Sequence, residues 1–81
     1  MVIVKYLTML YNKKMINYEP FWATLKAKGI STYTLINKYN ISSGTLDRMR
    51  KGNGISTLKI DDLCRILDCR VEDIIEYKKD T

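Results

Sequence analysis

The fold is decided by residues 32–51, which read TYTLINKYNISSGTLDRMRK. Six apolar residues recur through this stretch at helical spacing, namely Leu35, Ile36, Tyr39, Ile41, Leu46 and Met49. Asn40 separates the two halves, and Asn enters the left-handed backbone conformation more readily than any residue except Gly. The pattern predicts two short helices, over 31–39 and 42–51, that cross steeply at a tight turn. Their apolar faces are then expected to converge on one point.

The second of these helices is expected to leave one polar face outside. Ser31 and Ser42 are favourable N-caps for the two helices, and Gly52 stops the second. The outer face of the second helix then presents Ser43, Gly44, Asp47, Arg48 and Lys51. Small residues at its start allow close approach to another surface, and the free N–H groups of a helix start suit a phosphate.

A preceding helix is predicted over residues 17–28. Asn17 is its expected cap, Glu19 suits the positive end of the helix dipole, and Gly29 ends it. Pro20 falls in the first turn, where a missing N–H costs nothing. Trp22 has two interpretations, an aromatic stacking site for a ligand or core packing, and its apolar neighbours on the same face favour core packing.

Two more helices are predicted after Gly54. Residues 56–67 place Ile60, Leu63, Cys64 and Leu67 at i, i+3, i+4 and i+7, a strong amphipathic pattern. Residues 71–78 carry acidic residues early and lysines late, as the dipole favours. We therefore expect an all-α, compact five-helix domain over residues 17–79, with little sign of strands after residue 17.

Residues 1–16 do not follow this helical rhythm and are assigned to an N-terminal arm. Their Val, Ile and Tyr content allows a strand, and an extended or partly disordered arm is an equal alternative.

Composition removes several classes of function. The chain has no His, so His general bases and His metal ligands are absent. Two cysteines, Cys64 and Cys69, are too few for a disulfide scaffold or a four-thiolate zinc site. The adjacent pair Asp61 and Asp62 is better explained as a solvated helix face than as a catalytic pair. No apolar run reaches the length of a membrane span. We expect a cytoplasmic binding domain, with no enzymatic activity, cofactor, metal or small-molecule substrate.

The net charge of +5 is unevenly distributed. Residues 31–56 carry four basic residues and one acidic residue, whereas residues 57–81 carry five basic and seven acidic ones. Lys5, Lys13 and Lys14 make the N-terminal stretch basic as well. This polarity predicts an anionic partner on one side of the domain, with the acidic end facing away.

Residues 31–52 resemble the helix-turn-helix of the Cro/C1-type, phage-repressor-like DNA-binding domains (the XRE family). Residues 55–75 look like the family's fourth and fifth helices, so the resemblance covers about residues 17–77. It implies a compact, lambda-repressor-like five-helix fold. Two positions depart from the pattern: Ile36 stands where the family has a small Ala, and Asn40 where it has Gly.

The resemblance also assigns roles to individual residues. Residues of the second helix of the pair would face base edges in the major groove, namely Ser43, Gly44, Thr45, Asp47 and Arg48. Arg48 suits bidentate pairing with guanine. Asp47 either accepts from cytosine or pairs with Arg48, Arg50 or Lys51. Phosphate contacts are expected from Thr32, Tyr33, Lys38, Arg50, Lys51 and Asn53.

The predicted function is sequence-specific binding of double-stranded DNA by a small transcriptional regulator, a repressor that acts by occupying its operator. The resemblance implies a homodimer, formed through the last two helices or through the arm residues Val2, Ile3, Val4, Leu7 and Leu10. The alternative is a protein-interaction module, such as an antitoxin-like partner, with DNA binding secondary.

Overall fold

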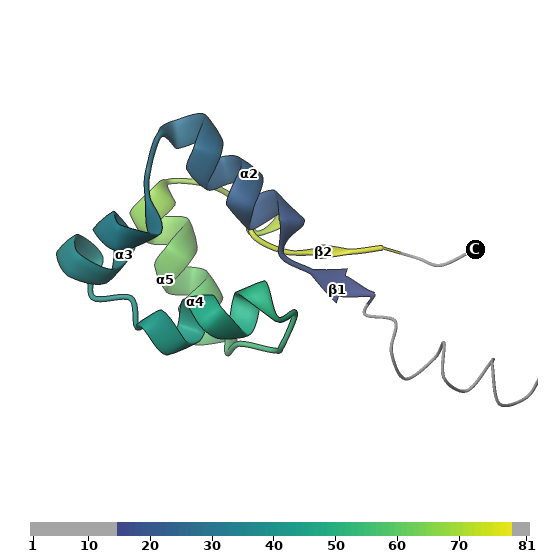
Figure 1. The fold of residues 1–81 in the computed structure, drawn as a ribbon. Helices are drawn as coiled ribbons and strands as arrows, with labels where there is room; N and C mark the ends of the chain where they lie inside the picture. Colours follow the sequence, from purple (N-terminus) through teal and green to yellow (C-terminus); the bar gives the residue numbers. More distant parts are fainter. Residues whose placement is uncertain (1–14, 79–81) are drawn as a thin grey trace, which may run out of the picture.

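The computed structural model describes residues 15–78, and most of them are helical. The elements are β1 (Ile16–Asn17), α2 (Glu19–Lys28), α3 (Thr32–Tyr39), α4 (Ser43–Arg50), α5 (Thr57–Leu67), the 3₁₀ helix η1 (Val71–Asp73) and β2 (Glu76–Tyr77). The four α-helices gather around one core, and the β1–β2 ribbon lies at one side of them (Figure 1). Residues 1–14, which contain nearly all of the expected arm and its apolar dimer candidates, lie outside the described residues.

Serine side chains fix the starts of three helices. Ser31, Ser42 and Ser56 are the N-caps of α3, α4 and α5, and each accepts a hydrogen bond from the backbone N–H three residues later, at 3.1, 3.1 and 3.2 Å. Each such cap stabilises its helix by about 1 kcal/mol. The predicted starts after Ser31 and Ser42 are therefore confirmed.

The start of α2 differs from the expectation. Asn17 belongs to β1 rather than capping the helix, and Tyr18 occupies the cap position without a side-chain hydrogen bond. Asn17 still satisfies one free donor, because its Oδ1 accepts from the Glu19 N–H at 3.0 Å. Pro20 lies in the first turn, as predicted.

Left-handed residues end three of the four described α-helices where the sequence predicts a stop, whereas α4 ends at Arg50 with Lys51 in the right-handed conformation. Gly29 closes α2 with φ +66°, and Asn40 closes α3 with φ +59°. The same conformation at Asp68 ends α5, with φ +49°. After Asn40, the Ile41 N–H donates to the Leu35 carbonyl at 3.0 Å, which secures the tight turn before α4.

The core joins all four α-helices. Ten side chains are at most 5 % exposed, namely Tyr18, Phe21, Leu25, Leu35, Ile41, Leu46, Met49, Leu63, Leu67 and Ile74. Leu35, Ile41, Leu46 and Met49 therefore converge as predicted. Ile36 is half-buried at the edge of this core. The prediction for Tyr39 is wrong: its ring is 37 % exposed in the last turn of α3, with the Lys38 ammonium 5.5 Å from its centroid.

The predicted fifth helix is also wrong. Residues 71–73 form one 3₁₀ turn, closed by the Ile74 N–H donating to the Val71 carbonyl at 2.9 Å. Only one of its β-branched residues packs fully, because Ile74 is 0 % exposed whereas Val71 is 55 % exposed. With a single buried anchor and low helix propensity, the segment lacks the apolar face that a longer helix needs.

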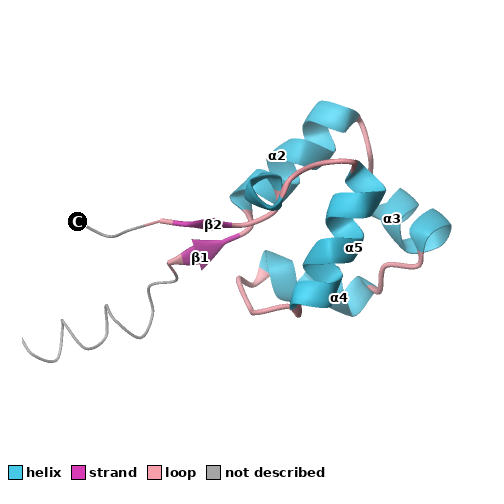
Figure 2. Ribbon diagram, turned by 180° about the vertical axis from the view of Figure 1, so that it is seen from behind, coloured by secondary structure: helices cyan, strands magenta, loops and turns pink. Residues whose placement is uncertain are grey.

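The chain then becomes extended and pairs with β1, although the sequence shows little sign of strands after residue 17. β2 runs antiparallel to β1, with Ile16 opposite Tyr77 and Asn17 opposite Glu76 (Figure 2). The Lys78 N–H extends the pairing by donating to the Met15 carbonyl at 2.7 Å. Pairing across the ribbon supplies the backbone bonds that a helix would have made internally. Ile16, the last residue assigned to the arm, is thus part of the folded domain.

Candidate nucleic-acid interface

The inner face of α4 is locked against the core. Leu46 and Met49 are 1 % and 2 % exposed, and Ile41 in the preceding turn is 3 % exposed. A helix of only eight residues has little stability of its own, so this packing is what holds it. The orientation of its opposite face is therefore fixed by the fold.

That opposite face carries four of the five residues predicted to contact bases. The exposed residues are Ser43, Gly44, Asp47 and Arg48, and Lys51 continues the face beyond the helix end. A Cβ added at Gly44 would meet only Ser42 Oγ, at 3.9 Å, so nothing within the domain demands a glycine there.

Thr45 requires a correction. Its side chain is 8 % exposed, and its hydroxyl shares a 2.8 Å hydrogen bond with the Ser42 hydroxyl. Its backbone N–H also donates to Ser42 Oγ. Thr45 therefore belongs to the capping structure of α4 and faces inward, because it lies one helical turn before the buried Met49.

Asp47 has a defined partner among the alternatives considered. Its Oδ2 lies 3.0 Å from Lys51 Nζ, one helical turn away, and both side chains are more than half exposed. A pair in this exposed setting contributes well below about 1 kcal/mol to stability. Its main effect is electrostatic, because it offsets one positive charge beside the exposed face of α4.

Arg48 turns toward the loop that follows α4. Its Nε donates to the Gly54 carbonyl at 3.1 Å. The same loop is held from the other side, where the buried Tyr18 donates its hydroxyl to the Asn53 carbonyl at 2.8 Å. Neither Tyr18 nor Gly54 was expected from the sequence, because every residue offers a backbone carbonyl and the pattern gives no signal of which one is used.

The residues predicted to contact phosphates are dispersed. Tyr33 is 74 % exposed at the start of α3, whereas Thr32 and Asn53 are half-buried. Lys38 and Arg50 are exposed, and each lies over an aromatic ring. Lys51 is exposed and paired with Asp47.

Trp22 packs as predicted. It is half-buried against the core, with its ring 4.8 Å from that of Phe21 in an edge-on arrangement. The Arg50 guanidinium covers it at 5.4 Å from the ring centroid, a cation–π contact between α4 and α2.

The two cysteines lie together at the end of α5. Both are free and half-buried, and Cys64 packs against the core as predicted. Burial raises the pKa of the Cys69 thiol to about 11, and burial also raises the pKa of Cys64. The thiol form thus predominates at neutral pH, which makes both poor nucleophiles.

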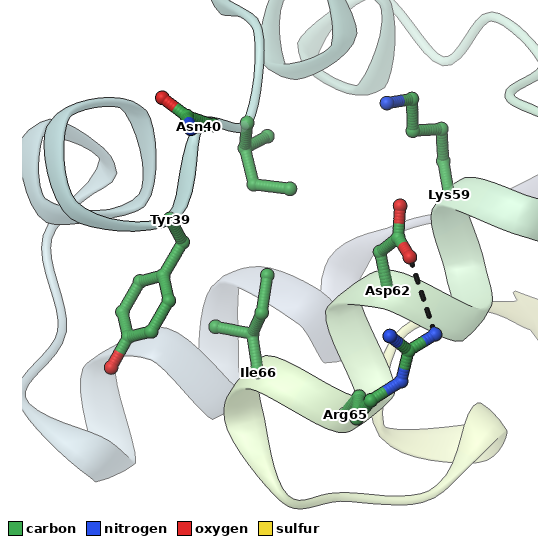
Figure 3. Close-up of a pocket in the computed structure, with 7 residues that line it drawn as sticks. Tyr39, Asn40, Lys59, Asp62, Arg65 and Ile66 are labelled. Carbon is green, nitrogen blue, oxygen red and sulfur yellow. Dashed lines mark hydrogen bonds and ion pairs between the residues drawn. The ribbon is translucent and has the colours of Figure 1, made fainter.

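A separate open groove of about 440 Å³ lies between the end of α3 and α5. Tyr39 and Asn40 border one side, and Lys59, Asp62 and Ile66 border the other (Figure 3). Arg65 on its rim pairs with Asp62 at 3.4 Å and also with Asp61. None of the lining residues belongs to α4, so the groove is not part of the exposed face described above.

Within residues 15–78, no three His, Cys, Asp or Glu side chains are grouped as metal ligands. No helix in this part of the chain is long and apolar enough to cross a membrane.

Comparison with known proteins agrees with this geometry. The sequence pattern of the Cro/C1-type HTH DNA-binding domain matches residues 21–80, which is most of the chain. The fold is similar to the crystal structure of the transcriptional regulator VanUg, with a TM-score of 0.72 and 23 % identity over 82 % of this chain and 88 % of that one. The search of the curated proteins gave no match. The match over residues 21–80 shows that the chain belongs to the family of Cro/C1-type helix-turn-helix DNA-binding domains.

Proposed function

We propose that the protein is a transcriptional regulator that binds a specific operator in double-stranded DNA and represses by occupying it. The observation that carries this proposal is the two-sided character of α4. Its inner residues are locked into the core, and its outer residues Ser43, Gly44, Asp47 and Arg48 are free to enter a major groove. The regulator VanUg, which shares the fold, supports a role in transcription.

In this proposal the outer face of α4 reads base edges. Arg48 pairs with guanine O6 and N7, the commonest specific contact of this kind. Gly44 brings the backbone close to the DNA, and Ser43 contributes one adaptable hydroxyl. Asp47 acts through its pair with Lys51, which lowers the net positive charge of the outer face of α4.

Phosphate contacts position the domain without reading sequence. We assign them to residues at the ends of α3 and α4 and in the following loop, namely Thr32, Tyr33, Lys38, Arg50, Lys51 and Asn53. The cationic members supply the salt-dependent attraction to the backbone. Tyr33 is well placed for a hydroxyl contact, because it is 74 % exposed in the first turn of α3.

A homodimer is the second part of the proposal. We place its interface on the last two helical elements, where the apolar residues Leu58 on α5 and Val71 on η1 are 74 % and 55 % exposed. A symmetric dimer reads two half-sites about one helical turn of DNA apart. Repression then follows from occupancy of a promoter-proximal site, with no chemical step.

The test is a binding titration on random duplex DNA at several salt concentrations. The three cationic phosphate contacts per domain, from Lys38, Arg50 and Lys51, predict a log–log slope of about −2.7, since each phosphate neutralised by Lys or Arg contributes about −0.9. Selection from a random duplex library is then expected to return a two-fold symmetric site. A flat salt dependence, or no binding at low salt, contradicts the proposal, and an asymmetric site contradicts the symmetric dimer.

A further inference from the structure

The backbone of the loop after α4 is fixed by hydrogen bonds on both sides of Asn53. The Asn53 N–H donates to the Arg48 carbonyl at 2.8 Å, and the Asn53 carbonyl accepts the Tyr18 hydroxyl at 2.8 Å. The Gly52 N–H adds a bond to the Met49 carbonyl at 3.1 Å. With the peptide groups flanking Asn53 fixed, the Gly54 Cα is fixed as well, and the Gly54 carbonyl moves only by rotation about its own φ and ψ.

The Gly54 carbonyl is the acceptor for Arg48 Nε, at 3.1 Å. A guanidinium has five N–H donors in a planar fork, so this bond leaves the four donors on the terminal nitrogens. Guanine takes two of these in a bidentate contact. A bond at Nε is therefore compatible with reading guanine, and it fixes the rotation of the guanidinium plane.

The first donor in this series of hydrogen bonds is Tyr18, whose position is fixed by the core. Its side chain is 4 % exposed and belongs to the core cluster, so packing sets the position of its hydroxyl. It enters from the junction of β1 and α2, 35 residues before Asn53. The β1–α2 junction is thereby coupled to the end of α4.

We infer that Tyr18 is a positioning residue for base reading by Arg48, acting through the backbone of Asn53 and Gly54. This inference rests on the proposed function. Without the Tyr18 hydroxyl, the Gly54 carbonyl is less restricted and Arg48 explores more rotamers. The loss of preorganisation weakens discrimination at the base that Arg48 reads, and leaves the other base contacts of α4 unchanged.

The test compares Tyr18→Phe with Thr24→Val. Tyr18→Phe keeps the ring and removes only the hydroxyl. Thr24→Val is the matched control, because Thr24 Oγ1 also makes a part-buried bond to a distant backbone carbonyl, that of Asp73, at 2.8 Å. Competition binding uses the selected operator, its three single-base variants at the Arg48 position, its variants at other positions, and random duplex.

Arg48→Ala is expected to lower the base preference at its position by about 5- to 150-fold, the range of a bidentate contact. Tyr18→Phe is expected to lower it by about 3- to 10-fold, a part of the Arg48→Ala effect, and to keep the salt slope of the wild type, because it removes no cationic phosphate contact. Thr24→Val leaves the preference unchanged. In the Arg48→Ala background, Tyr18→Phe is expected to have no further effect at this base.

Three results overturn the inference. One is an equal loss of affinity at every operator position in Tyr18→Phe. Another is persistence of its effect in the Arg48→Ala background, and the third is an unchanged preference in Tyr18→Phe. A measurement without DNA adds to these: NMR exchange of the Arg48 Nε–H should be faster in Tyr18→Phe than in the wild type, and equal rates also overturn the inference.

Failure of the proposed function is visible separately. If the wild type does not bind duplex, or if Arg48→Ala keeps the wild-type preference, the reading role of Arg48 falls and the inference falls with it. If the wild type reads the operator through Arg48 and Tyr18→Phe matches it, only the positioning role of Tyr18 is lost.

Discussion

Asp47 Oδ2 lies 3.0 Å from Lys51 Nζ on the exposed side of α4, so the face proposed to meet DNA carries an internal ion pair. The carboxylate has two opposing effects there. It holds the Lys51 ammonium in place, and it repels nearby phosphates. Because both side chains are more than half exposed, the pair holds Lys51 only weakly, and repulsion of the approaching polyanion by Asp47 is the larger of the two effects.

Asp47→Asn is therefore expected to tighten binding to random duplex, by about 3- to 10-fold at low salt, and to steepen the salt slope by up to about 1. Asp61→Asn is the matched control, because Asp61 pairs with Arg65 at the same spacing on α5, away from the α4 face. Fluorescence anisotropy across a salt series measures both. Equal gains in the two variants would assign the effect to net charge alone.

Gly44 gives a second prediction, in which stability and binding move in opposite directions. An added Cβ has room in the free protein, where only Ser42 Oγ lies within 4 Å, at 3.9 Å. Alanine also lowers the cost of helix formation, so Gly44→Ala should raise the free energy of unfolding by up to about 1 kcal/mol. If the backbone of Gly44 approaches the DNA, the same methyl weakens operator binding by about tenfold, or about 1.4 kcal/mol. Thermal unfolding and operator titration of the same sample measure the two effects, and undiminished operator affinity would place Gly44 away from the DNA.

Ser42 and Ser43 are neighbours with different expected roles. Ser42 Oγ accepts from the Thr45 N–H at 3.1 Å and shares a bond with the Thr45 hydroxyl, whereas Ser43 lies on the outer face. Ser42→Ala should lower the free energy of unfolding by about 1–2 kcal/mol through loss of the cap. Ser43→Ala should leave stability within about 0.5 kcal/mol and change operator binding instead. Denaturant unfolding compares the pair, and similar stability losses in both would refute this division of roles.

The elements of the fold that depend on local interactions are predictable from the sequence, and those that depend on distant pairing are not. The caps at Ser31 and Ser42 and the left-handed turn at Asn40 depend on neighbours within a few residues, so the sequence pattern placed α3 and α4 correctly. The helix predicted after Val71 is wrong because the backbone bonds of this segment go to β1, some 60 residues earlier. Its local helical charge pattern carried no information about that pairing.

The site was predictable to the same extent. Helical spacing identified Ser43, Gly44, Asp47 and Arg48 as one exposed face and left Thr45 out of it; only the family resemblance added Thr45, whose side chain is buried and bonded to Ser42. The bonds from Tyr18 to Asn53 and from Arg48 to Gly54 end on backbone carbonyls. Such acceptors have no side-chain signature, so only the folded chain reveals them.

The cysteine pair predicts how stability depends on pH. Burial raises the pKa of Cys69 from 9.0 to about 11 in the folded state. The unfolded chain therefore loses its thiol proton at lower pH than the folded chain, and this favours unfolding once the pH exceeds about 9. The stabilising contribution is fully present below pH 9 and falls as the pH rises toward about 11.

Cys69→Ser removes this titration while keeping a small polar side chain, so the free energy of unfolding of the variant should decline less than that of the wild type between pH 8.5 and 10.5. Urea unfolding at a series of pH values under reducing conditions measures the difference. Parallel declines in the two proteins would show that other groups, such as tyrosines and lysines, govern the alkaline limb.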